Sequence, residues 1–186
     1  RIGARRSRDL PWRPRMARPG SMIRTAVWFA GAGGASWGLP PHFHVVVAVE
    51  GEGGVTSIHR ANMDHPVLQV DVSDERALRD ALRPFFPIHF VQLSPPCQQF
   101  SRMYSGEEGA CAELTVQAAR ALVWLRPRAF LLENVPGMVE RERPGGAWER
   151  ALALLRSGGF AVDWRTVCAS WCGACTARSR VWVFGT

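Results

Sequence analysis

An apolar, β-rich run passes directly into a glycine-rich turn in the stretch Arg24-Thr-Ala-Val-Trp-Phe29-Ala30-Gly31-Ala32-Gly33-Gly34. Further β-rich runs follow at residues 45–50, 67–71, 89–93, 129–133, 161–167 and 181–184. Helix-like stretches separate them at residues 54–62, 74–82, 111–125 and 148–157. This alternation predicts an α/β fold of the Rossmann-like type, with a mostly parallel, twisted sheet that is covered by helices on both faces.

The length and composition indicate one ordinary globular domain. A chain of 186 residues can bury a single core, and 47% hydrophobic with 21% charged residues suits a globular protein. No apolar run reaches membrane-spanning length, so we expect no membrane association. The five cysteines occur without a secretory signal, which favours a reducing compartment and a cytoplasmic enzyme.

The positive charge is concentrated in one short segment. Residues 1–20 hold seven arginines against Asp9, which leaves only +1 of the total +7 for residues 21–186. Residues 1–21 also contain three prolines and no apolar periodicity, so we expect a disordered or non-native tail before a catalytic core at 22–186. A targeting peptide is the alternative, but the prolines oppose the amphipathic helix that it would need.

In such folds ligands bind beyond the carboxyl ends of the strands, where this chain carries glycines and acids. The glycine turn would let the backbone approach a ligand, although its spacing departs from that of NAD-binding sites. Glu50 could accept hydrogen bonds from both hydroxyls of a ribose, and Asp71 could accept one from an exocyclic amino group. The alternative for the glycine turn is an ordinary tight turn, and for Glu50 it is a solvated charge at a strand end. For Asp71 the alternative is a helix cap, although Asp74 is the better candidate for that cap.

A cysteine follows two prolines at a later strand end, in Ser94-Pro95-Pro96-Cys97-Gln98. Most single cysteines fill a core, but a stiff proline loop favours a displayed thiol, and a thiolate is a strong nucleophile. Farther on, Glu133-Asn134-Val135 ends another strand and Arg178-Ser179-Arg180 precedes the last one. The alternative for the arginines is a surface ion pair.

In this order the motifs resemble those of the cytosine-5 DNA methyltransferase family, and the resemblance covers residues 23–186. It implies S-adenosylmethionine as cofactor, DNA with a flipped cytosine as partner, and a place in bacterial or phage-type restriction and modification of DNA. The implied catalytic residues are Cys97, Glu133, Arg178 and Arg180. The implied cofactor-binding residues are Phe29, Gly31, Gly33, Gly34, Glu50, Asp71 and Pro95, and no metal is implied.

The resemblance also assigns a role to each catalytic group. The Cys97 thiolate adds to carbon 6 of cytosine, which makes carbon 5 nucleophilic, while Glu133 holds N3 and the exocyclic amino group. Arg180 is expected to point at the carbonyl O2, and Arg178 to order the nucleophile loop or a nearby phosphate. The base must leave the duplex stack, so residues 94–109 are expected to close over it.

The chain departs from the family pattern in a few places. Thr176 stands where the family commonly has Gln, and His89 stands where it often has Asp. We expect the chain to stop before the target-recognition region and the closing cofactor segment, so that a separate chain could supply recognition. Two alternatives stay open, namely a cytosine in tRNA as the substrate and an inactive fragment that binds cofactor or DNA weakly.

The cysteines at 168, 172 and 175 suggest a different class of enzyme. Their spacing is that of iron–sulfur enzymes that cleave S-adenosylmethionine to radicals, with unbonded thiols as the plainer interpretation. That motif normally sits early in a β/α barrel, whereas only eleven residues follow Cys175. The context therefore disfavours a cluster.

Overall fold

The computed structural model describes residues 22–97, 110–140 and 144–186. The predicted tail at 1–21 and most of the nucleophile loop, from residue 98 to 109, lie outside the described residues.

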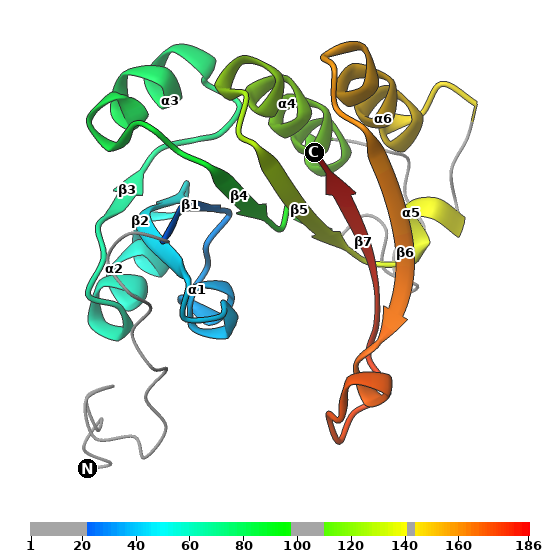
Figure 1. Cartoon of the computed structure of the whole chain (residues 1–186), viewed down its shortest axis with the longest axis horizontal. Coiled ribbons are helices and arrows are strands. Elements are labelled where there is room, and N and C mark those ends of the chain that lie inside the picture. Colours follow the sequence, from blue (N-terminus) through cyan, green and yellow to red (C-terminus); the bar gives the residue numbers. More distant parts are fainter. Residues whose placement is uncertain (1–21, 98–109, 141–143) are drawn as a thin grey trace.

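The strands of the described residues form one sheet of seven strands in the order β3-β2-β1-β4-β5-β7-β6 (Figure 1). β7 runs antiparallel to both of its neighbours, and the remaining pairings are parallel. The mostly parallel α/β fold that the sequence predicts is therefore confirmed. In chain order the strands are β1 (Ile23–Trp28), β2 (Phe43–Glu50), β3 (Val67–Gln69), β4 (Phe90–Leu93), β5 (Ala129–Asn134), β6 (Val162–Cys168) and β7 (Ser179–Gly185).

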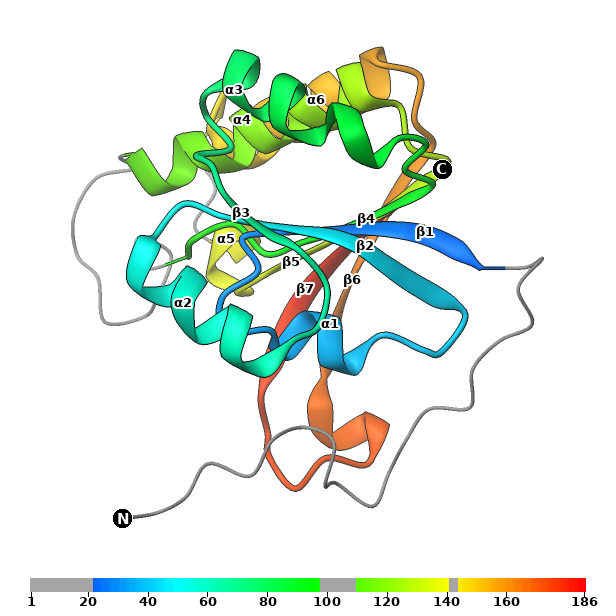
Figure 2. The same ribbon diagram turned by 90° about the vertical axis from the view of Figure 1, so that its left-hand side faces the viewer.

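Helices cover both faces of the sheet (Figure 2). One face carries α1 (Gly34–Gly38) and α2 (Gly53–Asn62), and the other carries α3 (Glu75–Leu82), α4 (Ala110–Leu125) and α6 (Ala147–Ser157). The sequence did not predict α1, α5 (Gly137–Glu140) or the 3-10 turns η2 (Arg83–Phe85) and η4 (Ala169–Cys172). These elements have three to five residues, too few to show a helical hydrophobic period. Within the described residues, no helix is both long and apolar enough to cross a membrane.

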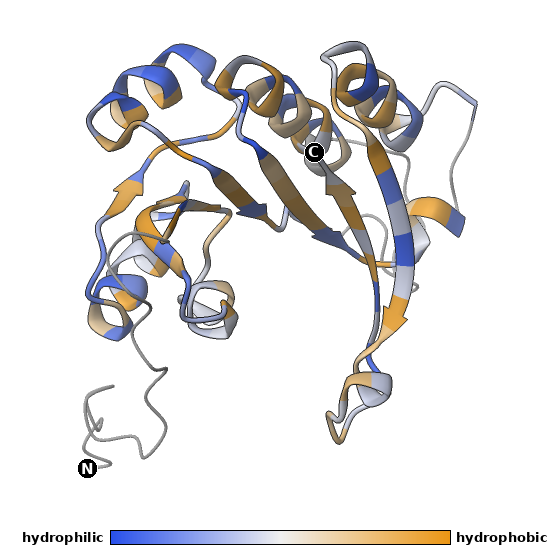
Figure 3. Cartoon of the chain, in the orientation of Figure 1, coloured by the Kyte–Doolittle hydropathy of each residue, from blue (hydrophilic) through white to orange (hydrophobic). Residues whose placement is uncertain are grey.

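The core lies between the sheet and the larger helices. Ala26, Val27 and Trp28 of β1 are completely buried, because a central parallel strand is covered on both faces. Ala26 and Trp28 share one buried cluster with Leu122 of α4 and Leu155 of α6, whereas Val27 belongs to a second, smaller cluster. Figure 3 shows hydrophobic residues along β4 and β5, and hydrophilic residues on the outer side of α3. The sheet is thus a rigid platform for the loops at its carboxyl edge.

Part of one sheet face is left uncovered by the helices of the described residues. Phe130 and Leu132 of β5 are buried in the cluster that includes α4 and α6. Because side chains alternate along a strand, Leu131 and Glu133 face the opposite side, and Trp182 of β7 faces that side too, since it pairs directly with Glu133. This face carries α1 and α2 only over the β1–β3 half of the sheet.

Strand β3 ends earlier than the sequence predicts. β3 ends at Gln69 rather than at residue 71, so Asp71 lies in the following turn instead of at the strand end. The Asp71 carboxylate accepts a hydrogen bond from the Ser73 N–H at 2.8 Å, and such local side-chain bonding competes with strand pairing. Asp74 is the cap of α3, as predicted, because its side chain accepts from the Ala77 N–H.

Candidate active site

Three adjacent parallel strands end at the same level of the sheet. Trp28 of β1 pairs with Leu93 of β4, which pairs with Leu132 of β5. The glycine loop and the Ser94–Cys97 segment therefore leave the sheet at one edge, and Glu133 lies near the end of β5 at that edge, where ligands of this fold class bind. The fold thus brings the two groups of predicted site residues to the same place.

The glycine loop has an unusual backbone at its first residue. Phe29 has φ +53°, a left-handed conformation that a bulky residue seldom adopts. Gly33 has φ +104°, and a Cβ there would lie 2.6 Å from the Met63 methyl carbon, so this position requires glycine. The Ala30 N–H donates to the Val49 carbonyl at 3.1 Å, which ties the loop to β2. Strained backbone that the surroundings hold in place is typical of a functional site.

The Glu50 carboxylate lies against this loop. One oxygen accepts from the Gly31 N–H at 2.9 Å and the other accepts from the Glu52 N–H at 3.0 Å. Because a carboxylate oxygen has two lone pairs, each can accept one more hydrogen bond. Asp71 belongs to the neighbouring turn, since a Cβ on Gly51 would lie 3.9 Å from its Cα. The two predicted cofactor acids are therefore neighbours.

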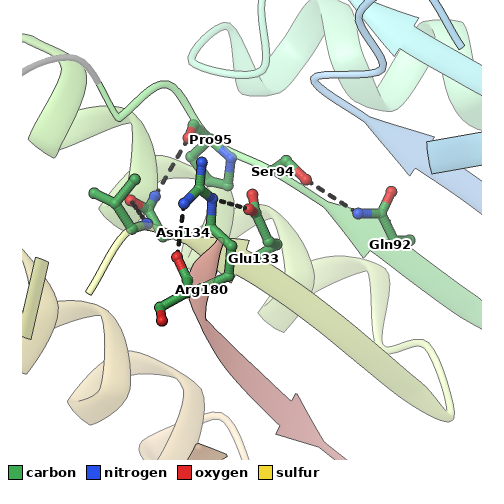
Figure 4. A network of polar contacts seen from close by, with 8 residues as sticks. Gln92, Ser94, Pro95, Glu133, Asn134 and Arg180 are labelled. Carbon is green, nitrogen blue, oxygen red and sulfur yellow. Dashed lines mark hydrogen bonds and ion pairs between the residues drawn. The ribbon is translucent and has the colours of Figure 1, made fainter. Parts of the chain in front are cut away.

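The base of the cysteine loop is anchored from β4 and β5 (Figure 4). Asn134, which is almost completely buried, donates from Nδ2 to the Pro95 carbonyl at 3.3 Å and accepts from the Val135 N–H at 2.9 Å. On the other side, Gln92 Nε2 donates to Ser94 Oγ at 3.1 Å. The partly buried Cys97 thiol follows two residues after Pro95. These contacts hold the loop as it leaves the sheet.

Glu133 and Arg180 form an ion pair across β5 and β7 (Figure 4). Arg180 Nε lies 2.7 Å from Glu133 Oε1, and the two side chains are only 18% and 19% exposed. Arg180 Nη1 also donates to the Ser179 carbonyl at 2.6 Å. The pair is thus largely buried, unlike the surface ion pair that is the alternative for these residues. Within the described residues no hydrogen bond joins the Cys97 thiol to it.

The ion pair lies in an open hollow of about 630 Å³ on the uncovered face of the sheet. Its lining is mainly apolar, with the polar groups gathered at Glu133 and the arginines, and Arg178 itself is exposed. A planar heterocycle matches such a hollow, because its faces are apolar and its edges form hydrogen bonds. The lining includes Leu131, Glu133, Val167, Arg178, Arg180 and Trp182.

The three late cysteines lie in different surroundings. Cys168 is buried with its thiol 3.1 Å from Ser170 Oγ, and hydrogen bonds from Ser170 lower its pKa. Cys172 and Cys175 are exposed, and Cys172 lines the hollow. In the part of the chain that the structure describes, no three His, Cys, Asp or Glu side chains are grouped as metal ligands. The spacing in sequence therefore does not gather the three thiols into a cluster site.

Some residues of the site carried no assignment from sequence. Asn134 was visible only as part of the Glu-Asn-Val motif, and its bond to Pro95 spans 39 positions. His59 and Asn62 of α2 contact the glycine loop from about thirty positions away. Their spacing of three places them on one helix face, but that spacing alone does not say what the face contacts.

Comparison with known proteins shows which family this chain resembles. The family model of C-5 cytosine-specific DNA methylases matches residues 23–186. Type II methyltransferase M.HgiDI of Herpetosiphon aurantiacus is 29% identical over 165 residues, which cover 88% of this chain and 52% of that protein. M.HindV of Haemophilus influenzae is 26% identical over 161 residues, covering 84% of this chain and 51% of that protein. The chain thus spans about half the length of these relatives.

Solved structures give the same result. A DNA modification methyltransferase from an E. coli prophage superposes with a TM-score of 0.70 at 28% identity, over 88% of this chain and 46% of that one. The S. pombe Dnmt2 methyltransferase shares the fold, with a TM-score of 0.64 at 21% identity. The resemblance seen in the sequence is confirmed, and the chain belongs to the C-5 cytosine-specific DNA methylase family.

Proposed function

We propose that this chain is the catalytic core of a DNA cytosine-5 methyltransferase, which transfers a methyl group from S-adenosylmethionine to carbon 5 of a flipped cytosine. The observation that carries the proposal is the largely buried Glu133–Arg180 pair, which lies in a mainly apolar hollow of about 630 Å³ near the edge of the sheet from which the Cys97 loop leaves. The type II methyltransferases among the relatives support a role in restriction and modification, and DNA as the substrate.

The residues at the glycine loop fit S-adenosylmethionine. Glu50 offers two further acceptor positions for the ribose hydroxyls, and Asp71 has a second carboxylate oxygen for the adenine amino group. Beside Gly31 there is open space, since nothing lies within 4 Å of a Cβ built on it, so a ligand can come close to the backbone there. Phe29, Gly33, Gly34 and Pro95 complete the proposed site. When bound, the cofactor supplies an electrophilic methyl group.

Cys97 is the proposed nucleophile. Its thiolate would form a bond to carbon 6 of the cytosine, and the electron pair of the 5,6 double bond would move to carbon 5. Carbon 5 would then take the methyl group while the bond between that methyl and the sulfonium sulfur breaks and a neutral thioether leaves. Loss of the carbon 5 proton to water and breaking of the sulfur–carbon 6 bond would restore the aromatic ring and the free thiolate. The hydrogen bond from Asn134 to Pro95 fixes the start of the loop that presents the thiol.

Glu133 and Arg180 would stabilise the ring while the thiolate adds. Glu133 would accept a hydrogen bond from the exocyclic amino group and deliver to N3 a proton taken up from water, and Arg180 would donate to the carbonyl O2. The negative charge that develops on the ring would thus be neutralised at N3 and stabilised by a hydrogen-bond donor at O2. Before the base enters, the two side chains are each other's partners at 2.7 Å, which keeps both oriented in the hollow. Arg178, on the exposed rim, is suited to a phosphate or to the closing loop.

The choice of DNA over tRNA can be tested by following labelled methyl groups. The chain is incubated with labelled S-adenosylmethionine and either mixed-sequence duplex DNA or tRNA, alone and together with a separately expressed recognition half of a relative such as M.HgiDI. We expect label at carbon 5 of DNA cytosines when the recognition half is present, and none in tRNA. Label found only in tRNA would show that the substrate is tRNA rather than DNA. Cofactor binding without transfer to either substrate would indicate an inactive fragment.

A further inference from the structure

The last turn of α2 contacts the glycine loop at consecutive residues. The His59 Nδ1 atom lies 2.9 Å from the Gly31 carbonyl oxygen, and Asn62 Nδ2 donates to the Ala32 carbonyl at 2.8 Å. The side chain of Met63, which follows Asn62, occupies the space where a Cβ on Gly33 would lie. The C-terminal end of α2 therefore contacts three consecutive residues of the glycine loop, Gly31, Ala32 and Gly33.

Both polar backbone groups of Gly31 are held by side chains. Its N–H donates to Glu50 at 2.9 Å, and its carbonyl faces His59 at 2.9 Å. His59 is completely buried, and sequence gave it no role. The histidine is thus linked through a single residue to the carboxylate that we propose for the ribose.

The positions of the protons on His59 and His65 follow from the atoms that each ring contacts. A carbonyl oxygen only accepts, so His59 carries its hydrogen on Nδ1, and its Nε2 is the acceptor in the neutral ring. That Nε2 lies 3.0 Å from His65 Nε2, which must then donate, and Ser36 Oγ lies 3.3 Å from the same His65 atom. Burial, and then the nearby His59, lower the pKa of His65 to about 4, so His65 is neutral near pH 7. The two contacts are satisfied together when His59 donates to the Gly31 carbonyl and a neutral His65 donates to His59 Nε2.

We infer that His59 is a positioning residue of the cofactor site, which it serves by fixing the carbonyl of Gly31 and through it the orientation of Glu50. The inference rests on the proposed S-adenosylmethionine site. Without the His59 proton the loop gains conformations in which the Gly31 N–H and Glu50 no longer face each other. A ligand must then order the loop as it binds, which lowers affinity without removing any direct contact.

The test compares two substitutions of His59 in the full chain. His59→Asn keeps an N–H donor near the position of Nδ1, whereas His59→Leu keeps the bulk and removes the donor. We expect His59→Leu to weaken S-adenosylmethionine binding roughly tenfold in titration calorimetry, the size of one lost hydrogen bond to a held group. His59→Asn should stay within about threefold of the unsubstituted chain. Ser57→Ala, on the exposed side of the same helix, is the matched control and should change nothing.

A second measurement needs no cofactor. Hydrogen exchange of the Gly31 amide in the ligand-free chain should speed up about tenfold in His59→Leu and recover in His59→Asn. Equal binding and equal exchange in the folded Leu variant would overturn the inference, as would an Asn variant that is folded but as weak as Leu. If the unsubstituted chain bound no cofactor, the proposed cofactor site would fail, while the exchange data would still decide whether His59 holds the loop.

Discussion

Glu133 and Arg180 lie 2.7 Å apart with less than one fifth of each side chain exposed. An ion pair that is partly removed from water leaves an uncompensated charge when one partner is lost, unlike an exposed pair. The geometry therefore separates these two residues from the other ion pairs of the described residues, whose side chains are at least 46% exposed.

The charge of Glu133 should matter for chemistry more than for cofactor binding. Glu133→Gln keeps the shape and an oxygen that Arg180 can still contact, but it removes the acid–base group at N3. We expect turnover, measured together with the recognition half, to fall by roughly two orders of magnitude or more, with cofactor affinity unchanged. Glu140→Gln, at an exposed position, is the control. Unchanged turnover in Glu133→Gln would contradict the assignment.

Cys97 should form the covalent bond to the base. On DNA with 5-fluorocytosine the fluorine cannot leave as a proton does, so the cysteine adduct persists after methyl transfer and survives denaturing electrophoresis. We expect such an adduct with the unsubstituted chain plus recognition half, and none with Cys97→Ser. Cys172→Ser alters a thiol that lines the hollow, and this variant should still form the adduct. A Cys97→Ser protein that trapped as well would remove Cys97 from the mechanism.

At the scale of elements, α2 and the segment before β3 meet at two histidines. His65, just before β3, faces His59 and Ser36, with Asp64 and His44 nearby. The neutral imidazole of His65 is favoured in the folded chain, chiefly by burial. The contact between these elements therefore depends on pH.

The stability of the fold should fall as the pH drops from about 6.5 to about 4. His65 has a folded pKa of about 4 against an ordinary value of 6.5, so the unfolded chain binds more protons in this window. The contribution to stability is fully present above the upper limit and is lost by the lower one. Without solvent screening it would reach about 3 kcal/mol, and the partial exposure of His65 reduces it. Urea unfolding at several pH values should show this slope.

The slope can be assigned to His65 by substitution. In His65→Asn the dependence between these pH values should become shallower, because the titrating group is gone. His42→Asn changes an exposed histidine and should leave the slope unchanged. A His65→Asn chain with the same pH dependence as the unsubstituted chain would assign the effect to other groups.

At the scale of the whole molecule, the charge is unevenly distributed along the chain. Of the net charge of +7, the segment 1–20 supplies +6. The core itself is nearly neutral overall, because its 16 arginines are matched by 15 acidic residues. Its net charge therefore adds little to the attraction for phosphates that dominates affinity for DNA.

Deleting residues 1–21 should therefore abolish most sequence-blind DNA binding. We expect the full chain to bind a labelled duplex weakly in anisotropy measurements, with affinity that drops steeply between roughly 50 and 200 mM salt. The shortened chain should show little binding at either salt concentration, while its cofactor affinity stays the same. Equal, salt-sensitive binding by both chains would place the phosphate-binding surface in the core instead.

The sequence by itself determined the local elements and the chemical groups. Each predicted strand and each of the four predicted helices is present, because hydrophobic period and turn residues act over a few neighbours. In the predicted helix at residues 148–157, the apolar residues that recur at helical spacing are buried, namely Trp148, Ala151, Leu152 and Leu155. The family could also be read from the order of its motifs, since its chemistry requires a thiol, an acid and arginines of fixed type.

Only the tertiary structure decided how distant groups meet. β7 enters the sheet between β5 and β6 in the opposite direction, and this insertion brings Arg180 against Glu133. Likewise His59 contacts Gly31 because α2 packs beside the glycine loop, although 28 positions separate them. Local propensity contains no information on strand order or on which helix face meets which loop, because these follow from burying the whole sheet at once.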